Sequence, residues 1–147
     1  MAETLGSLCD KLTIVDLKIW HSTDAEKLKA LQSQKISLQK EIDEFVTSAL
    51  AGTIPLERLT FAAHKVYKKR GNKIARVVGG LGDVFSQLAR TNCALWHEQE
   101  KVYEFEKVPN AEKVTVVKKL AVLKLERNKC MEALDRILVG LVKQQTH

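Results

Sequence analysis

Apolar residues recur at intervals of three and four along most of the chain, which is the spacing of one face of an α-helix. The first run covers residues 5–21, and a longer run ends at about residue 50. Two more cover residues 83–107 and about thirty residues from Asn110, and a basic helix is expected to start at Pro55. No segment alternates as a strand does, so the pattern predicts an all-α antiparallel bundle of four to six helices.

Capping residues mark where these helices begin. Residues 23–26 match a capping box, in which the Thr23 hydroxyl takes an amide hydrogen and Glu26 reaches back to the cap. Asp83 follows a cluster of glycines and is expected to cap the third long helix, as Asn110 is expected to cap the last. We expect the apolar side of the last helix to consist of Val117, Leu120, Leu123, Met131, Leu134, Ile137, Leu138 and Leu141.

A short pattern containing Trp-His occurs twice in the predicted helices. The copies are Leu12-x3-Asp16-x2-Ile19-Trp20-His21-x2-Asp24 and Leu88-x3-Asn92-x2-Leu95-Trp96-His97-x2-Glu100. They contain the only two tryptophans of the chain. Internal repetition reports how a fold is assembled, so it predicts two pseudo-equivalent helices that face each other in one core.

One interpretation of the repeat is structural. Asp16 and Asn92 lie one helical turn before Trp20 and Trp96, respectively, so each can accept the indole N–H of its tryptophan. A buried tryptophan usually needs such a partner. This interpretation places both tryptophans in the core of the bundle.

A second interpretation is a divalent metal site. His21 and Asp24, like His97 and Glu100, place an imidazole and a carboxylate three residues apart. Two such pairs from two helices can supply four ligands to one metal in a bundle core. The chain would then be a metal-dependent enzyme.

A third interpretation is a ligand or partner pocket between the helices, in which tryptophan stacks on a sugar or another ring. The residues expected to line it are Asp16, Trp20, His21, Asn92, Trp96, His97, Arg127 and Asn128. The sequence leaves the three interpretations open.

The net charge of +6 is concentrated in one segment. Residues 57–76 hold seven basic residues and one acidic residue, a balance that equals the charge of the whole chain. This segment predicts a basic binding face for an acidic surface or phosphate, formed by Lys65, Lys68, Lys69, Arg70, Lys73 and Arg76. Nucleic acid is not an expected partner, because the segment has too few aromatic residues to stack bases.

The length predicts a single domain over residues 1–147. The three cysteines are widely spaced and lie in apolar surroundings, as expected for buried thiols in a reducing compartment. No secretory leader or long apolar run is evident. We therefore expect a soluble, cytoplasmic protein without a membrane span.

The segment Leu8–Lys18 resembles the opening of small bacterial helical domains of unknown function that begin "ELxDKLTILEIK". The second Trp-His copy is similar to their "NxxLW-x2-ED" helix, and Arg127-Asn128 stands where they carry an "RN" element. Trp20-His21 has no counterpart in the shorter pattern, and the basic segment lies outside the likeness. Such domains occur beside glycosyltransferases of surface-polysaccharide assembly. The resemblance implies a helical fold and that association, and it transfers no catalytic residue.

Together these features predict a non-catalytic helical accessory or interaction module. Its partner is expected to be another protein or a second copy of the chain, and no cofactor is expected. The resemblance connects this module to polysaccharide or glycosyl-transfer machinery. The alternative is the metal-dependent enzyme that uses His21, Asp24, His97 and Glu100.

Overall fold

The computed structural model describes residues 3–60 and 79–145. These residues form four α-helices and two single turns of 3-10 helix, and they contain no strand, which confirms the all-α prediction. The helices are α1 (Leu5–His21), α2 (Ala25–Leu50), α3 (Leu81–Tyr103) and α4 (Asn110–Gln145), and the 3-10 turns are η1 (Leu56–Arg58) and η2 (Phe105–Lys107). Of the basic helix expected to start at Pro55, residues 55–60 are described and contain only the single turn η1, and the rest lies outside the described residues.

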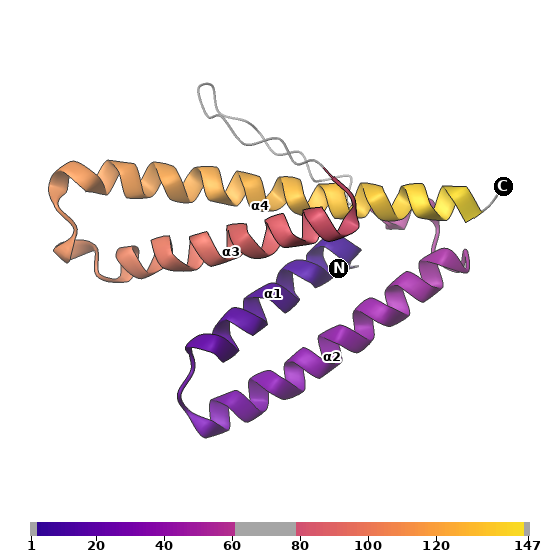
Figure 1. Ribbon diagram of the computed structural model, residues 1–147, viewed down its shortest axis with the longest axis horizontal. Coiled ribbons are helices and arrows are strands. Elements are labelled where there is room, and N and C mark those ends of the chain that lie inside the picture. The colour runs from indigo at the N-terminus through magenta and orange to yellow at the C-terminus, as the bar shows by residue number, and fades with distance from the viewer. Residues whose placement is uncertain (1–2, 61–78, 146–147) are drawn as a thin grey trace.

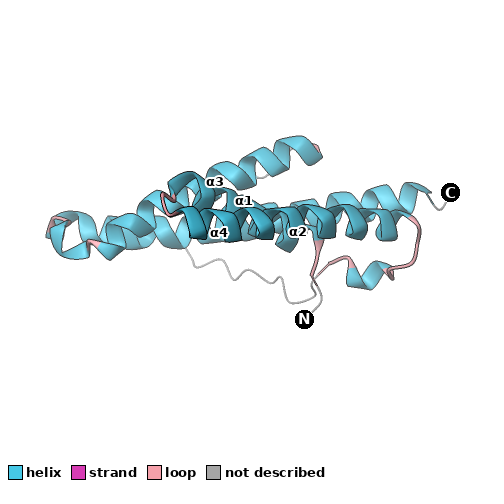
Figure 2. Ribbon diagram, turned by 90° about the horizontal axis from the view of Figure 1, so that it is seen from below, coloured by secondary structure: helices cyan, strands magenta, loops and turns pink. Residues whose placement is uncertain are grey.

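The helices form two antiparallel hairpins, α1–α2 and α3–α4 (Figure 1). Helix α1 contacts α2, α3 and α4, so it joins the two hairpins. The α3–α4 hairpin extends past the joint between α1 and α2 in both views (Figures 1 and 2). Among the described residues, its far end therefore consists of α3, η2 and α4, and neither α1 nor α2 covers it.

The main hydrophobic core lies where α4 meets α1, α2 and α3. Leu134 of α4 and Leu88 of α3 are fully buried there. A smaller cluster between α1 and α2 contains Leu8, Val15 and Leu38. The predicted apolar side of α4 is wrong at two positions, because Val117 is 56% exposed and Leu141 is 41% exposed. Their neighbours Val116 and Val142 are buried, so each exposed residue points about 100° away from the packed side of α4.

Two caps differ from the prediction by a short distance along the chain. The N-cap of α2 is Asp24 instead of Thr23, and its carboxylate accepts hydrogen bonds from the backbone N–H of Glu26, at 3.0 Å, and of the next residue. A carboxylate is a strong acceptor at the positive end of a helix. Gly80 is the N-cap of α3, and Asp83 inside the first turn accepts its N–H at 3.2 Å.

Helix α1 begins in close contact with the backbone of α4. The backbone N–H of Gly6 donates to Oδ1 of Asp135 at 2.7 Å, so a buried carboxylate from α4 serves an amide in the first turn of α1. A Cβ atom on Gly6 would lie 2.8 Å from the carbonyl carbon of Met131 and nearer still to its oxygen. This crossing therefore leaves no room for a side chain larger than that of glycine.

Candidate functional site

The two copies of the Trp-His pattern meet where α1 ends beside α3. The ring of His21 stacks on Trp96, with centroids 4.7 Å apart and planes 22° apart. The same imidazole lies edge-on to His97, with centroids 6.3 Å apart. We call His21, Trp96 and His97 the aromatic cluster. It joins the last residue of α1 to the C-terminal half of α3.

A backbone carbonyl orients the exposed imidazole of His21. Its Nδ1 lies 2.8 Å from the carbonyl oxygen of Leu17, one turn earlier in α1. Because a carbonyl only accepts hydrogen bonds, Nδ1 carries the hydrogen in this contact. In a neutral ring, Nε2 is then the nitrogen with a lone pair.

The prediction that both tryptophans lie in the core is wrong. Trp20 is 85% exposed, and Trp96 is only half-buried. Successive residues of a helix point about 100° apart, so Trp20 points elsewhere when its neighbour His21 lies on α3. Asp16, expected to accept the Trp20 indole N–H, instead forms a 2.9 Å ion pair with Lys35 of α2.

Asn92 holds α3 against α1. This buried residue donates from Nδ2 to Oδ1 of Asp10 at 2.9 Å and to Oγ1 of Thr13 at 2.7 Å. The Thr13 hydroxyl in turn donates to the Asp10 carbonyl at 2.8 Å. Both hydrogen bonds are donated by the amide nitrogen of Asn92, whereas the prediction for Trp96 concerned the amide oxygen as an acceptor. The two copies of the repeat occupy unlike environments, since Asp16 is exposed.

The four predicted metal ligands do not converge. Helix α1 ends at His21, and Asp24 lies beyond that end and caps α2. Of the four, the two histidines share the aromatic cluster, while Glu100 is exposed on α3. Within residues 3–60 and 79–145, no group of three or more His, Cys, Asp or Glu side chains could hold a metal ion.

The remaining predicted site residues fall into two groups. Arg127 and Asn128 are half-buried on α4, and Nε of Arg127 is buried without a hydrogen-bond partner among the described residues. The whole predicted basic face lies in the segment 61–78, outside the described residues, and it comprises Lys65, Lys68, Lys69, Arg70, Lys73 and Arg76.

Glu98 is a buried charge that the sequence analysis missed. It is 4% exposed, and its Oε1 lies 3.1 Å from Nζ of both Lys101 and Lys119. Burial raises the pKa of this carboxyl, but the two ammonium groups outweigh burial and hold the pKa below its ordinary value. The three-residue spacing to Lys101 was a local signal for an ion pair. The contact with Lys119 depends on how α3 and α4 pack.

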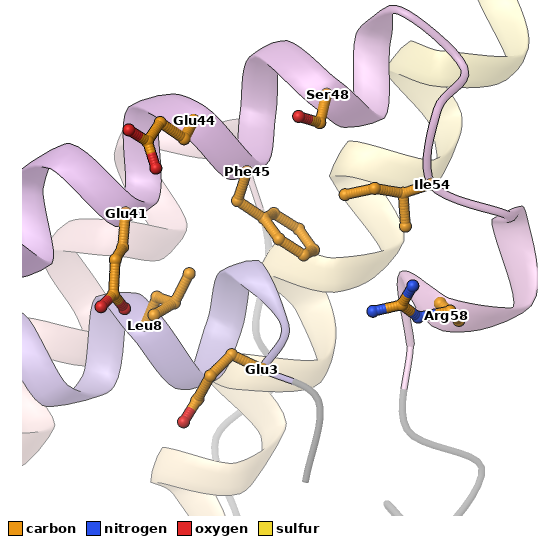
Figure 3. A pocket seen from close by; sticks show the side chains of 8 residues that line it. All are labelled: Glu3, Leu8, Glu41, Glu44, Phe45, Ser48, Ile54 and Arg58. Carbon is orange, nitrogen blue, oxygen red and sulfur yellow. The ribbon is translucent and has the colours of Figure 1, made fainter.

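A second feature that the sequence did not predict is a groove between α1 and α2. A pocket of about 280 Å³ lies at one end, with Leu8, Phe45 and Ile54 around its interior (Figure 3). Its other lining residues are Glu3, Glu41, Glu44, Ser48 and Arg58. Glu41 also borders a neighbouring pocket of about 390 Å³, which is lined in addition by Lys11, Ile14, Val15, Lys18, Gln34, Ser37 and Leu38. None of the site residues predicted from the repeat lines either pocket.

No described helix is both long enough and apolar enough to cross a membrane. Comparisons with known protein families, with curated proteins and with solved structures found no match.

Proposed function

We propose that this chain is a non-catalytic helical interaction module that binds a protein partner through Trp20 and the aromatic cluster. The observation that carries the proposal is the 85% exposure of Trp20 at the end of α1, beside His21 and its stack on Trp96. Tryptophan combines a large apolar surface with one hydrogen-bond donor, and it is enriched among residues that dominate binding energy at protein interfaces.

The polar groups of the repeat support a module more than an enzyme. Asn92 joins two helices, Asp24 caps a third, and Asp16 pairs with Lys35 across the α1–α2 hairpin. Each of these groups has a structural partner in the helical framework. The resemblance noted in the sequence extends the proposal to a partner from polysaccharide or glycosyl-transfer machinery.

The proposal is tested with Trp20→Ala. Because Trp20 is mostly exposed, the substitution should leave thermal stability nearly unchanged. Proteins cross-linked to the full chain in cells are identified by mass spectrometry, and the enriched partner is then purified and titrated. We expect Trp20→Ala to weaken binding about tenfold or more, as loss of a binding hot spot does.

The matched control is Gln32→Ala, which alters an exposed polar residue of α2 and should bind as the unaltered chain does. Equal affinity for the two variants would contradict the assignment of the surface to Trp20. If no partner binds saturably, the interaction function itself is wrong.

A further inference from the structure

The face of α3 that holds α1 continues beyond the end of α1. Asn92 and Trp96 contact α1 through Asp10 and His21. Tyr103 lies seven residues after Trp96, which returns it to the same side of the helix. It is 88% exposed, because α1 has already ended at His21.

The face of α4 that holds α1 shows the same continuation. Met131 and Asp135 contact Gly6 at the start of α1. Steps of three and four residues from Met131 back along α4 lead through exposed Ala121 to Val117 and Val114. These valines are 56% and 62% exposed.

Helix lengths explain why no other described helix covers these two faces. Helix α1 has 17 residues and α4 has 36, so at 1.5 Å per residue α1 can span only about half of α4. The α3–α4 hairpin therefore projects past α1 and α2 (Figures 1 and 2). We call the exposed continuation, formed by Tyr103, Val114, Val117 and Ala121, the tip face.

The two helices of the tip carry opposite net charges. Residues 98–107 contain four glutamates and two lysines, a net charge of −2, whereas residues 110–124 contain one glutamate and four lysines, a net charge of +3. If two copies stacked their tip faces in opposite directions about a two-fold axis, α3 would face α3 and α4 would face α4. That arrangement brings like charges together, so the charges disfavour it. In the other two-fold arrangement, with both tips pointing the same way, the two α1 helices would collide, because α1 lies on this same face of α3 and α4.

We infer that the tip face binds one amphipathic helix of a different protein, with an apolar stripe between a basic flank that faces α3 and an acidic flank that faces α4. This inference rests on the proposed function and names its partner chemistry. The occupant lies beyond α1 and extends the contact that α1 makes with the two faces. Apolar contact with Val114 and Val117 supplies affinity. The acidic edge of the tip face along α3 and its basic edge along α4 select a partner helix with oppositely charged flanks.

The test uses a fluorescent synthetic helix of about four turns, with Leu on one face, Lys on one flank and Glu on the other. Its binding to the full chain is followed by fluorescence anisotropy. We expect saturable binding that Val117→Asp weakens about tenfold or more, because a buried apolar contact is replaced by a charge. Ile36→Asp is the control, since Ile36 is 65% exposed on α2, away from the tip face. A probe that binds both variants equally would overturn the inference.

Charge selection is tested with the double variant Glu100→Lys and Glu104→Lys, which makes both edges of the tip basic. This variant should bind the mixed-charge probe more weakly and a probe with Glu on both flanks more tightly than the unaltered chain does. Unchanged preference would overturn the assignment of the flanks. Light scattering of the chain alone should give a monomer, and a dimer abolished by Val117→Asp would show that a second copy covers the face instead.

Failure of this inference is distinguishable from failure of the proposed function. A cellular partner whose binding depends on Trp20 and ignores Val117→Asp would overturn the tip face and leave the interaction module intact. Circular dichroism of Val117→Asp and of a second exposed variant, Tyr103→Ser, should report unchanged folding, because both side chains are more than half exposed.

Discussion

Substitution of Gly6 by alanine tests whether the close contact between α1 and α4 organises the fold. The added methyl group would meet the main chain of Met131, 2.8 Å from its carbonyl carbon and 2.9 Å from its Cα. A backbone cannot rotate aside as a side chain can, so the start of α1 must move away from α4. That movement also stretches the 2.7 Å hydrogen bond from the Gly6 amide to Asp135.

The size of the effect follows from two opposing contributions. Alanine favours a helix over glycine by about 0.5–1 kcal/mol. Overpacking of a close contact costs about 1–3 kcal/mol, and loss of a hydrogen bond to a charged group costs about 1.5–3 kcal/mol. We expect Gly6→Ala to lower the free energy of unfolding by about 2–4 kcal/mol in total.

Urea unfolding followed by circular dichroism measures this difference. For a slope of about 2 kcal/mol per molar urea, the midpoint should fall by about 1–2 M. Gly140→Ala is the matched control, because Gly140 lies inside α4 and an added Cβ would meet nothing within 4 Å beyond the adjacent residues and backbone of its own helix. It should raise stability by about 0.5–1 kcal/mol. The reasoning is refuted if Gly6→Ala also raises the midpoint.

Three further predictions concern charge, thiol chemistry and metal. Because the pKa of Glu98 is lowered from 4.5, its contribution to stability is present above that value and lost as the pH falls through the lowered pKa. Glu98→Gln should thus cost about 1 kcal/mol at pH 7, and urea titrations should show this cost shrinking as the pH falls below 4.5, whereas a constant cost would contradict the ion-pair explanation. Burial, together with the nearby carboxylates of Asp135 and Asp10, raises the pKa of Cys9 to about 12. Iodoacetamide at pH 8 should therefore label Cys9 only when the chain unfolds, whereas half-buried Cys93 should be labelled much faster in the folded chain. Rapid labelling of Cys9 in the folded chain, located by peptide mass spectrometry, would show that its site is open. Elemental analysis of protein purified without chelator should find far less than one metal per chain, and stoichiometric metal that His97→Ala removes would instead favour the enzyme alternative.

The helices themselves could be predicted from the sequence because helix formation depends on nearby residues. The run at 5–21 gives the bounds of α1, and the predicted end near residue 50 matches the end of α2. Asn110, expected to cap the last helix, is the first residue of α4, so this start is predicted to within one residue. Hydrophobic spacing, caps and proline act over one or two turns, so their signals are present in the local sequence.

The candidate site could be predicted only in part. The repeat identified His21, Trp96 and His97, which do come together, yet it assigned Trp20 to the core, although the side chain is exposed. Spacing within a helix tells which residues share a side, but it does not tell which side faces a neighbour at a helix end. That choice is made when α1 packs on α3.

The amino-acid sequence by itself determined the all-helical class, the span of the long helices and the residues available for capping. Only the tertiary structure decided that Asn92 bonds to α1, that Lys119 reaches Glu98, and that α1 and α2 leave the tip face exposed. The reason is physical: hydrogen bonds and apolar periodicity inside a helix are local, whereas contacts between helices depend on their lengths, crossing positions and register. Residues far apart in sequence acquire their partners only when those quantities are set.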